Sequence, residues 1–245
     1  MTSANGSLHE LGVLITGAGR GLGRALVLAF LQEGATVAAL IRNKAELDSL
    51  GREVAEAWPQ HRMRLLLQHG SALDRSCILK AVQSLQQATV ALDLLIANAG
   101  VFGPRQPFHA SDPQAWEEAL LNNVLGLSRT CHACIPALQA SGRGQILVLG
   151  SAIGHGHSSH ASAYAASKAM AWSLVKCLSL EFQPLGIAIN ELIPGPLHTA
   201  MNPAADSLPF CRDPGDPAIL ALIRYLCTAP GRPPSGQSFS LRPTA

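Results

Sequence analysis

Charged residues are scarce in this sequence, at 14% of 245 residues, whereas soluble domains average about 25%. Aromatic residues are scarcer still, at 4%, and the 18 Lys and Arg residues are scattered and nearly balanced by 16 Asp and Glu. A nucleic-acid-binding surface needs clustered cations with aromatic side chains nearby, so the sequence argues against nucleic acid as a partner. So little charge also suggests that part of the surface is covered in subunit contacts.

Membrane and export signals are missing as well. No apolar run approaches the roughly 18–20 residues of a bilayer-spanning helix, and residues 1–10 are polar, without the basic flank and apolar stretch of a secretory signal. The six cysteines are dispersed along the chain, which argues against a disulfide scaffold. We therefore expect a reduced, cytoplasmic protein with no membrane association.

What the sequence does contain is an alternation of short apolar runs and longer amphipathic stretches. Strands are predicted at 13–16, 36–41, 64–68, 92–97, 145–149, 187–192 and 237–241, and helices near 22–33, 44–57, 75–88, 113–140, 162–183 and 216–228. The strands show no polar alternation, as expected where helices cover both faces of a sheet. The pattern predicts one α/β domain over residues 1–245, a doubly wound parallel sheet of about seven strands flanked by helices (Rossmann-type), with a proline-rich substrate loop near 197–215.

A glycine cluster lies between the first predicted strand and the first predicted helix. It reads Thr16-Gly17-Ala18-Gly19-Arg20-Gly21-Leu22-Gly23, a T-G-x-x-x-G-x-G pattern. Glycines in such a turn let the backbone approach the pyrophosphate of a dinucleotide, and the following helix offers free N–H groups at its N-terminus. Glycine content alone fits an ordinary tight turn about equally well, but the position between strand and helix favours a dinucleotide site.

The end of the second predicted strand bears on the choice of dinucleotide. NAD enzymes carry an acid about 20 residues beyond the glycine turn, where it binds the ribose 2′-hydroxyl. This sequence has Ile41-Arg42-Asn43 and no acid at that point. Arg42 and Arg20 are suited to bind a 2′-phosphate by bidentate, charge-assisted hydrogen bonds. The alternative is that both are solvated surface arginines; we favour NADP(H).

Tyr164 and Lys168 lie four residues apart in an alanine-rich predicted helix, and therefore on one face of it. A phenol is a poor proton donor or acceptor at neutral pH until a nearby cation lowers its pKa, and a lysine one turn away is such a cation. This spacing often arises by chance. Ser151 follows the predicted strand 145–149, at the strand end where doubly wound sheets bind ligands, although a lone serine there is usually a turn residue. The three together predict a site for a substrate oxygen.

With these motifs in order, the sequence resembles the short single-domain members of the short-chain dehydrogenase/reductase family over roughly residues 8–241. Besides the glycine turn, Asn98-Ala99-Gly100 resembles the end of the family's N-N-A-G segment, with Ala97 in place of the first Asn, and Pro194-Gly195 with Thr199 resembles its P-G-x-x-x-T segment. The resemblance implies four catalytic residues: Asn123, Ser151, Tyr164 and Lys168. It implies that the cofactor contacts Gly17, Gly19, Arg20, Gly21, Leu22, Gly23, Arg42, Asn43, Asn98, Ala99, Gly100, Tyr164, Lys168, Pro194, Gly195, Leu197 and Thr199.

The family resemblance also implies a reaction: hydride transfer between NADP(H) and a ketone, aldehyde or alcohol on a small, partly apolar substrate. Tyr164 would exchange a proton with the substrate oxygen, Lys168 would lower the tyrosine's pKa and bind the nicotinamide ribose, Ser151 would hold the substrate oxygen, and Asn123 would position a water that relays protons to Lys168. The family habit implies a homodimer or homotetramer.

Two alternative functions remain open. A 3-oxoacyl-[acyl-carrier-protein] reductase would dock an acidic carrier on a basic face. The segments near 139–142 and 180–182, which resemble the family's carrier-docking positions in place, are nearly free of cations, which disfavours this alternative. A non-catalytic NADP-binding regulator would have no need of Tyr164. An apolar lid (Leu197, Met201, Leu208, Phe210) hints at an apolar substrate surface.

Several residues depart from the family pattern or could carry other chemistry. After the third predicted strand the chain reads His69-Gly70-Ser71-Ala72, without the Asp or Asn that often contacts adenine. Glu191 lies inside the sixth predicted strand, where a carboxylate needs a partner, water or a proton. His155, His157 and His160 could bind a metal, but no carboxylate or cysteine accompanies them, so we expect none; His155 or His157 is a candidate for substrate contact. Cys131 and Cys134 are expected to be buried helix residues.

Overall fold

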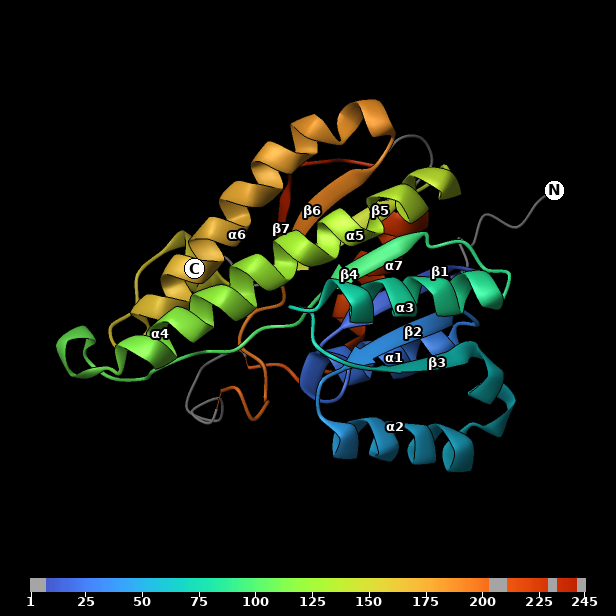
Figure 1. The fold of residues 1–245 in the computed structure, drawn as a ribbon, viewed down its shortest axis with the longest axis horizontal. Helices are drawn as coiled ribbons and strands as arrows, with labels where there is room; N and C mark the ends of the chain where they lie inside the picture. The colour runs from blue at the N-terminus through green and yellow to red at the C-terminus, as the bar shows by residue number, and fades with distance from the viewer. Residues whose placement is uncertain (1–7, 203–210, 229–232, 242–245) are drawn as a thin grey trace.

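The computed structural model describes residues 8–202, 211–228 and 233–241. Within them, seven parallel strands form one sheet in the order β3-β2-β1-β4-β5-β6-β7 (Figure 1). The strands are β1 (Gly12–Thr16), β2 (Thr36–Ile41), β3 (Leu65–His69), β4 (Leu94–Ala97), β5 (Gln145–Leu149), β6 (Ala188–Ile193) and β7 (Ser238–Ser240). The predicted doubly wound sheet is confirmed, and its order reverses between β1 and β4, the point where such sheets bind ligands.

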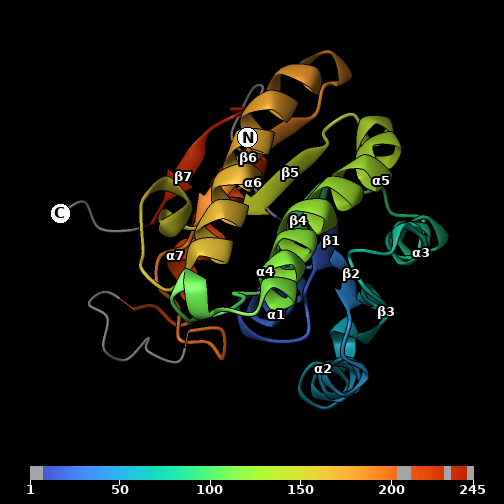
Figure 2. The same cartoon turned by 60° about the vertical axis from the view of Figure 1, so that its left-hand side comes forward.

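Helices cover both faces of the sheet, as Figures 1 and 2 show. One layer contains α1 (Gly21–Gln32), α2 (Lys44–Ala57) and α7 (Pro217–Thr228), and the other contains α3 (Arg75–Gln87), α5 (Gly126–Ser141) and α6 (Ser162–Glu181). Within β1, Val13 and Ile15 pack in the first layer, whereas Leu14 packs in the second. Because both sides of each central strand are buried, its sequence is apolar throughout.

The predicted helix 113–140 is interrupted. It consists of α4 (Pro113–Leu120), a π-helical turn, η3 (Leu121–Leu125), and α5. The wide turn carries Asn123, whose side-chain amide bonds to the backbone of Val101 in both directions, at 2.8 Å each. Single π-turns inside α-helices are rare and are frequent at functional sites.

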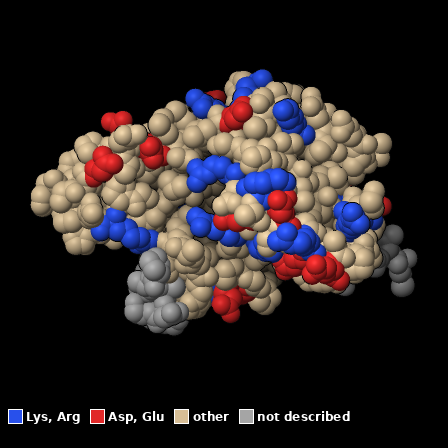
Figure 3. Space-filling view, turned by 60° about the horizontal axis from the view of Figure 1, so that its bottom comes forward, with Lys and Arg blue, Asp and Glu red and all other residues tan. Residues whose placement is uncertain are grey.

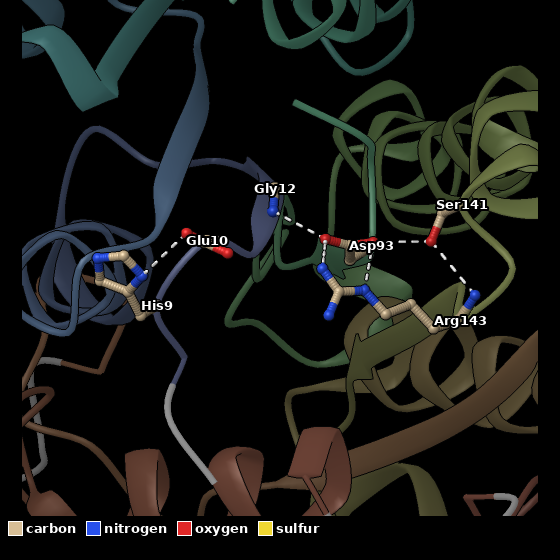
Figure 4. A network of polar contacts seen from close by, with 6 residues as sticks. All are labelled: His9, Glu10, Gly12, Asp93, Ser141 and Arg143. Atoms are coloured by element: carbon tan, nitrogen blue, oxygen red, sulfur yellow. Dashed lines mark hydrogen bonds and ion pairs between the residues drawn. The ribbon is translucent and has the colours of Figure 1, made fainter. Parts of the chain in front are cut away.

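A buried carboxylate fixes the edge of the sheet where the strands begin (Figure 4). Asp93, which is 3% exposed, precedes β4. Its Oδ2 accepts hydrogen bonds from the Gly12 N–H at 3.1 Å and from Arg143 Nη2 at 2.9 Å, and its Oδ1 accepts from Arg143 Nε at 2.9 Å and Ser141 Oγ at 2.7 Å. The Asp93 backbone also bonds to Gly12 and Gln145. The starts of β1, β4 and β5 are therefore held together at one point.

No helix among the described residues has the length and apolar character needed to cross a membrane.

Candidate active site

A cavity of about 1710 Å³ lies where the strands end. Segments that follow β1 to β6 line it, and every predicted site residue except Asn123 is among the lining residues. Figure 3 shows basic side chains gathered around a hollow in the surface, with acidic side chains among them. The charged lining residues are Arg20, Arg24, Arg42, Glu46, Glu53 and Lys168.

The glycine turn places uncapped backbone N–H groups in this cavity. Gly17 and Gly21 have φ values of 65° and 53°, a region that glycine adopts readily. No side chain caps the N-terminus of α1, so its first N–H groups are available to an anion. A Cβ at Gly23 would lie 2.3 Å from the Gly17 carbonyl oxygen. The turn is tied to the end of β4 by Asn98, whose Nδ2 donates to the carbonyls of Thr16 and Gly17 at 3.0 Å each.

The predicted arginines lie at the β2 end of the cavity, together with acids that the sequence reasoning missed. Arg20 Nε lies 3.7 Å from Glu46 Oε1, and Arg42 donates to the side chain of Asn122 at 3.3 Å. Asn43 caps α2 through its side-chain oxygen, which places Glu46 in the first turn of that helix. Glu46 lies outside the glycine motif and the β2 end, so no local pattern marked it.

Beyond β3 the cavity wall is formed by Gly70, Ser71, Ala72 and Leu73. The Ser71 hydroxyl accepts a hydrogen bond from the Leu73 N–H at 3.1 Å. The nearest acid, Asp74, instead caps α3, and its hydrogen bonds with Ser76 hold its pKa below the usual value. The wall here therefore offers backbone groups and small or apolar side chains.

Tyr164 and Lys168 face the cavity from α6. Lys168 is 8% exposed; its Nζ donates to the Leu149 carbonyl at 2.6 Å and lies 5.6 Å from the centroid of the Tyr164 ring. The Tyr164 ring stacks on Phe102 with centroids 4.6 Å apart and planes at 14°. Arg105 lies over Phe102, 3.4 Å from its centroid. The stacking itself was not predicted, because a ring contact across 62 residues of sequence leaves no local signal.

Asn123 lies behind this wall rather than in it. Its side chain is buried, and its Nδ2 donates to Ser167 Oγ at 2.8 Å as well as to Val101. Ser167 Oγ in turn donates to the Tyr164 carbonyl at 2.8 Å. The amide thus ties the segment after β4 to the helix that carries Tyr164 and Lys168. Ser167 was also missed by the sequence reasoning.

Ser151 begins the turn that follows β5. It caps the 3₁₀ helix η4 (Ala152–His155), and its Oγ accepts a hydrogen bond from the Ile153 N–H at 3.3 Å, which leaves the hydroxyl hydrogen free to donate elsewhere. At the end of η4, His155 Nε2 bonds to Glu191 at 2.7 Å. His157 lines the cavity, whereas His160 is exposed and does not.

The remaining predictions concern a metal site, the pair Cys131 and Cys134, and the apolar lid. In the described part of the chain, no three His, Cys, Asp or Glu side chains gather as metal ligands. Cys131 and Cys134 are buried, and burial raises the pKa of the Cys131 thiol to about 12. Of the expected lid, Leu197 and Met201 line the cavity, while Leu208 and Phe210 lie outside the described residues.

Comparison with known proteins identifies the family. The family model of short chain dehydrogenases matches residues 12–207. This chain belongs to that family. The short-chain dehydrogenases are oxidoreductases that act on CH–OH or C=O groups.

Three relatives illustrate the range of the family around this dehydrogenase. The chain is 31% identical over 188 residues to the 3-oxoacyl-[acyl-carrier-protein] reductase FabG of Thermotoga maritima, covering 77% of this chain and 74% of that protein. It is 30% identical over 227 residues to an uncharacterised NAD-dependent oxidoreductase of Mycobacterium tuberculosis, covering 88% and 82%. The structure of a short chain dehydrogenase from Shigella flexneri complexed with NADP superposes with a TM-score of 0.86 at 26% identity, covering 98% of this chain and all of that one.

Proposed function

We propose that this short-chain dehydrogenase uses NADP(H) to interconvert a ketone or aldehyde with its alcohol on a small, partly apolar substrate. The observation that carries the proposal is the convergence of Tyr164, Lys168 and Ser151 on one cavity with the uncapped N-terminus of α1. The first three residues suit proton exchange with an oxygen, and the helix N-terminus suits a phosphate.

The lining residues fit a dinucleotide along the length of the cavity. N–H groups of the glycine turn would hold the pyrophosphate, and Arg20 and Arg42 would bind a 2′-phosphate. The backbone of residues 70–73 would lie against the adenine, and Asn98, Ala99 and Gly100 would border the ribose. Pro194, Gly195, Leu197 and Thr199 would hold the nicotinamide, which supplies or accepts the hydride when bound.

Side chains of the protein transfer the proton and stabilise the resulting charge. In reduction, the Tyr164 hydroxyl donates its proton to the substrate oxygen, and the Ser151 hydroxyl donates a hydrogen bond to the same oxygen. The Lys168 ammonium lies beside the phenol ring and favours the negative charge left on it. Asn123 holds the segment after β4 against α6, so that these groups keep their spacing; the alcohol is oxidised by the reverse steps.

The cofactor preference rests on two observations that favour NADP(H), and it is opposed by Glu46 and by the resemblance to the NAD-dependent oxidoreductase of Mycobacterium tuberculosis. Arg20 and Arg42 lie at the rim, and the Shigella relative was determined with NADP. Glu46, in contrast, lies 3.7 Å from Arg20, so it competes with a 2′-phosphate for that guanidinium and repels the phosphate charge. We favour NADP(H) because Arg42 has no carboxylate partner within the described residues.

A second candidate is reduction of a 3-oxoacyl thioester on an acyl carrier protein, which the resemblance to FabG favours. A non-catalytic regulator would bind the dinucleotide without using Tyr164. We further propose that the protein self-associates through the helical segment from α4 to α5 and through α6. Large apolar side chains are exposed on η3, between α4 and α5 (Leu121 and Leu125), and on α6 (Met170, Trp172 and Leu180).

The test follows the oxidation of NADPH and NADH over a panel of ketones, aldehydes, quinones and a 3-oxoacyl thioester, with Tyr164→Phe in parallel. We expect turnover with NADPH that the variant loses while still binding NADPH. Turnover only with NADH would refute the cofactor assignment, and turnover only of the thioester would favour the carrier-protein reductase. Binding of NADPH without turnover of any panel member would favour the regulator.

A further inference from the structure

The buried carboxylate of Glu191, in the sheet beside the site, is not used by the chemistry above. Glu191 is 1% exposed. Its Oε2 is bonded by His155 Nε2 at 2.7 Å and by Ser238 Oγ at 2.6 Å, while its Oε1 has no hydrogen-bond partner. A buried carboxylate oxygen without a donor is unfavourable, so the position is not explained by stability alone.

Both ends of the turn that carries Ser151 touch this carboxylate. Gly150, directly before Ser151, lies so close that a Cβ there would come within 2.0 Å of Glu191 Oε1. At the other end of η4, His155 makes its hydrogen bond to Oε2. Glu191 therefore holds the turn on the β6 side.

The opposite side of the turn packs on α6. A Cβ at Gly154 would lie 2.8 Å from Lys168 Cβ, so the turn lies directly against the helix at the lysine. The His155 ring meets Trp172, one helical turn beyond Lys168, in an edge contact with centroids 5.2 Å apart and planes at 65°. The turn is thus fixed between β6 and α6.

We propose that Glu191 and His155 are a positioning pair that sets the hydroxyl of Ser151 relative to Tyr164. Neither residue is among those that line the cavity; the pair acts by holding both ends of the turn that Ser151 begins. The proposal rests on the proposed function of Ser151, and it accounts for the carboxylate in β6, which departs from the family pattern, and for its bond to His155 at the end of η4.

Two substitutions of His155 separate positioning from general packing. His155→Phe keeps a ring against Trp172 but removes the donor to Glu191. Because a misplacement of about 1 Å can cost about 100-fold in rate, we expect kcat to fall about 10- to 100-fold with the Kd for NADPH unchanged. His155→Gln places an amide N–H at a similar reach and should keep kcat within about threefold of wild type. His160→Asn, in the same loop but exposed, is the matched control and should leave kcat unchanged.

A double-mutant cycle with Ser151→Ala tests whether the pair acts through the serine. If it does, His155→Phe should lower kcat little further in the Ser151→Ala background. Fully additive losses would overturn the proposal, as would a His155→Phe enzyme with wild-type kcat. If His155→Phe does not fold because the buried Glu191 carboxylate has lost its histidine donor, the double variant His155→Phe with Glu191→Gln replaces it. That variant removes the charge and keeps an acceptor for Ser238.

Hydrogen exchange gives a readout that needs no substrate. The Gly154 N–H donates to the Ser151 carbonyl at 2.9 Å, so exchange of the peptide containing residues 150–156 reports whether the turn is held. We expect faster exchange there in His155→Phe than in His155→Gln or His160→Asn, and equal exchange would overturn the proposal. If wild type turns over no substrate, the proposed function fails, while this measurement still decides whether the pair holds the turn.

Discussion

Replacing Asp93 by alanine should destabilise the protein without altering its active site. The substitution leaves the buried N–H of Gly12 without its acceptor, which costs about 1–3 kcal/mol. The Arg143 side chain is 60% exposed and can be hydrated after the change, so the loss of its ion pair adds at most about 1 kcal/mol. The sum is about 1–4 kcal/mol of unfolding free energy.

Urea unfolding and thermal unfolding measure this loss. For a chain of this size each kcal/mol lowers Tm by about 2–4 °C, so we expect a decrease of about 2–16 °C. The matched control is Asp93→Asn, whose side-chain oxygen can still accept from Gly12; it should lose only about half as much.

The Asp93→Ala variant also shows whether the Asp93 cluster affects the active site. The Asp93 cluster lies where the strands begin, whereas the cavity lies where they end, so kcat and the NADPH Kd of folded Asp93→Ala should match wild type. A loss of stability below about 1 kcal/mol, or equal losses in the alanine and asparagine variants, would refute the assignment of the energy to the Gly12 donor.

Three further predictions concern the cofactor, pH and thiol reactivity. Arg42→Ala should weaken NADPH binding about 10- to 100-fold, the value of one charge-assisted hydrogen bond, and leave NADH binding unchanged, as fluorescence titration would show. The Arg212 guanidinium and a backbone N–H at the start of α7 lower the pKa of Asp216. Because the folded-state pKa is lowered, the carboxylate stabilises the fold above about pH 4, and this stabilisation is lost well below that pH. The Tm difference between wild type and Asp216→Asn should therefore be present near about pH 6 and vanish near about pH 2. With a pKa of about 12, Cys131 should resist alkylation near about pH 8 until the protein unfolds, as mass spectrometry of native and unfolded samples would reveal.

The sheet could be predicted from the sequence because its strands are marked by local pattern. The bounds of β2 and β5 match the prediction, since each is a continuous apolar run that ends at polar or glycine residues. The break in the helix 113–140 could not be predicted, because its apolar pattern runs through the π-turn. That turn depends on Asn123 meeting Val101 and Ser167, contacts that span 22 and 44 residues.

The same distinction applies to the site. Residues at the ends of parallel strands meet at one edge of a sheet whatever the side-chain detail, so the glycine turn, Ser151 and the segment at Pro194 could be placed together from their positions alone. Glu46 could not, because its contact with Arg20 depends on the path of α2, which begins beyond the end of β2.

Glu191 shows where a local conflict is itself informative. A carboxylate inside an apolar strand contradicts the pattern around it, and such conflicts tend to occur at functional sites. The register of the sheet pairs Glu191 with Val148, three residues before Ser151, which already brings the acid to the serine's end of β5. Which of the three nearby histidines reaches it is decided only by the path of η4. The missing Cβ atoms of Gly150 and Gly154 let this turn pack closely against Glu191 and Lys168. The sequence alone therefore identifies Glu191 as unusual, whereas its partner His155 can be identified only from the fold.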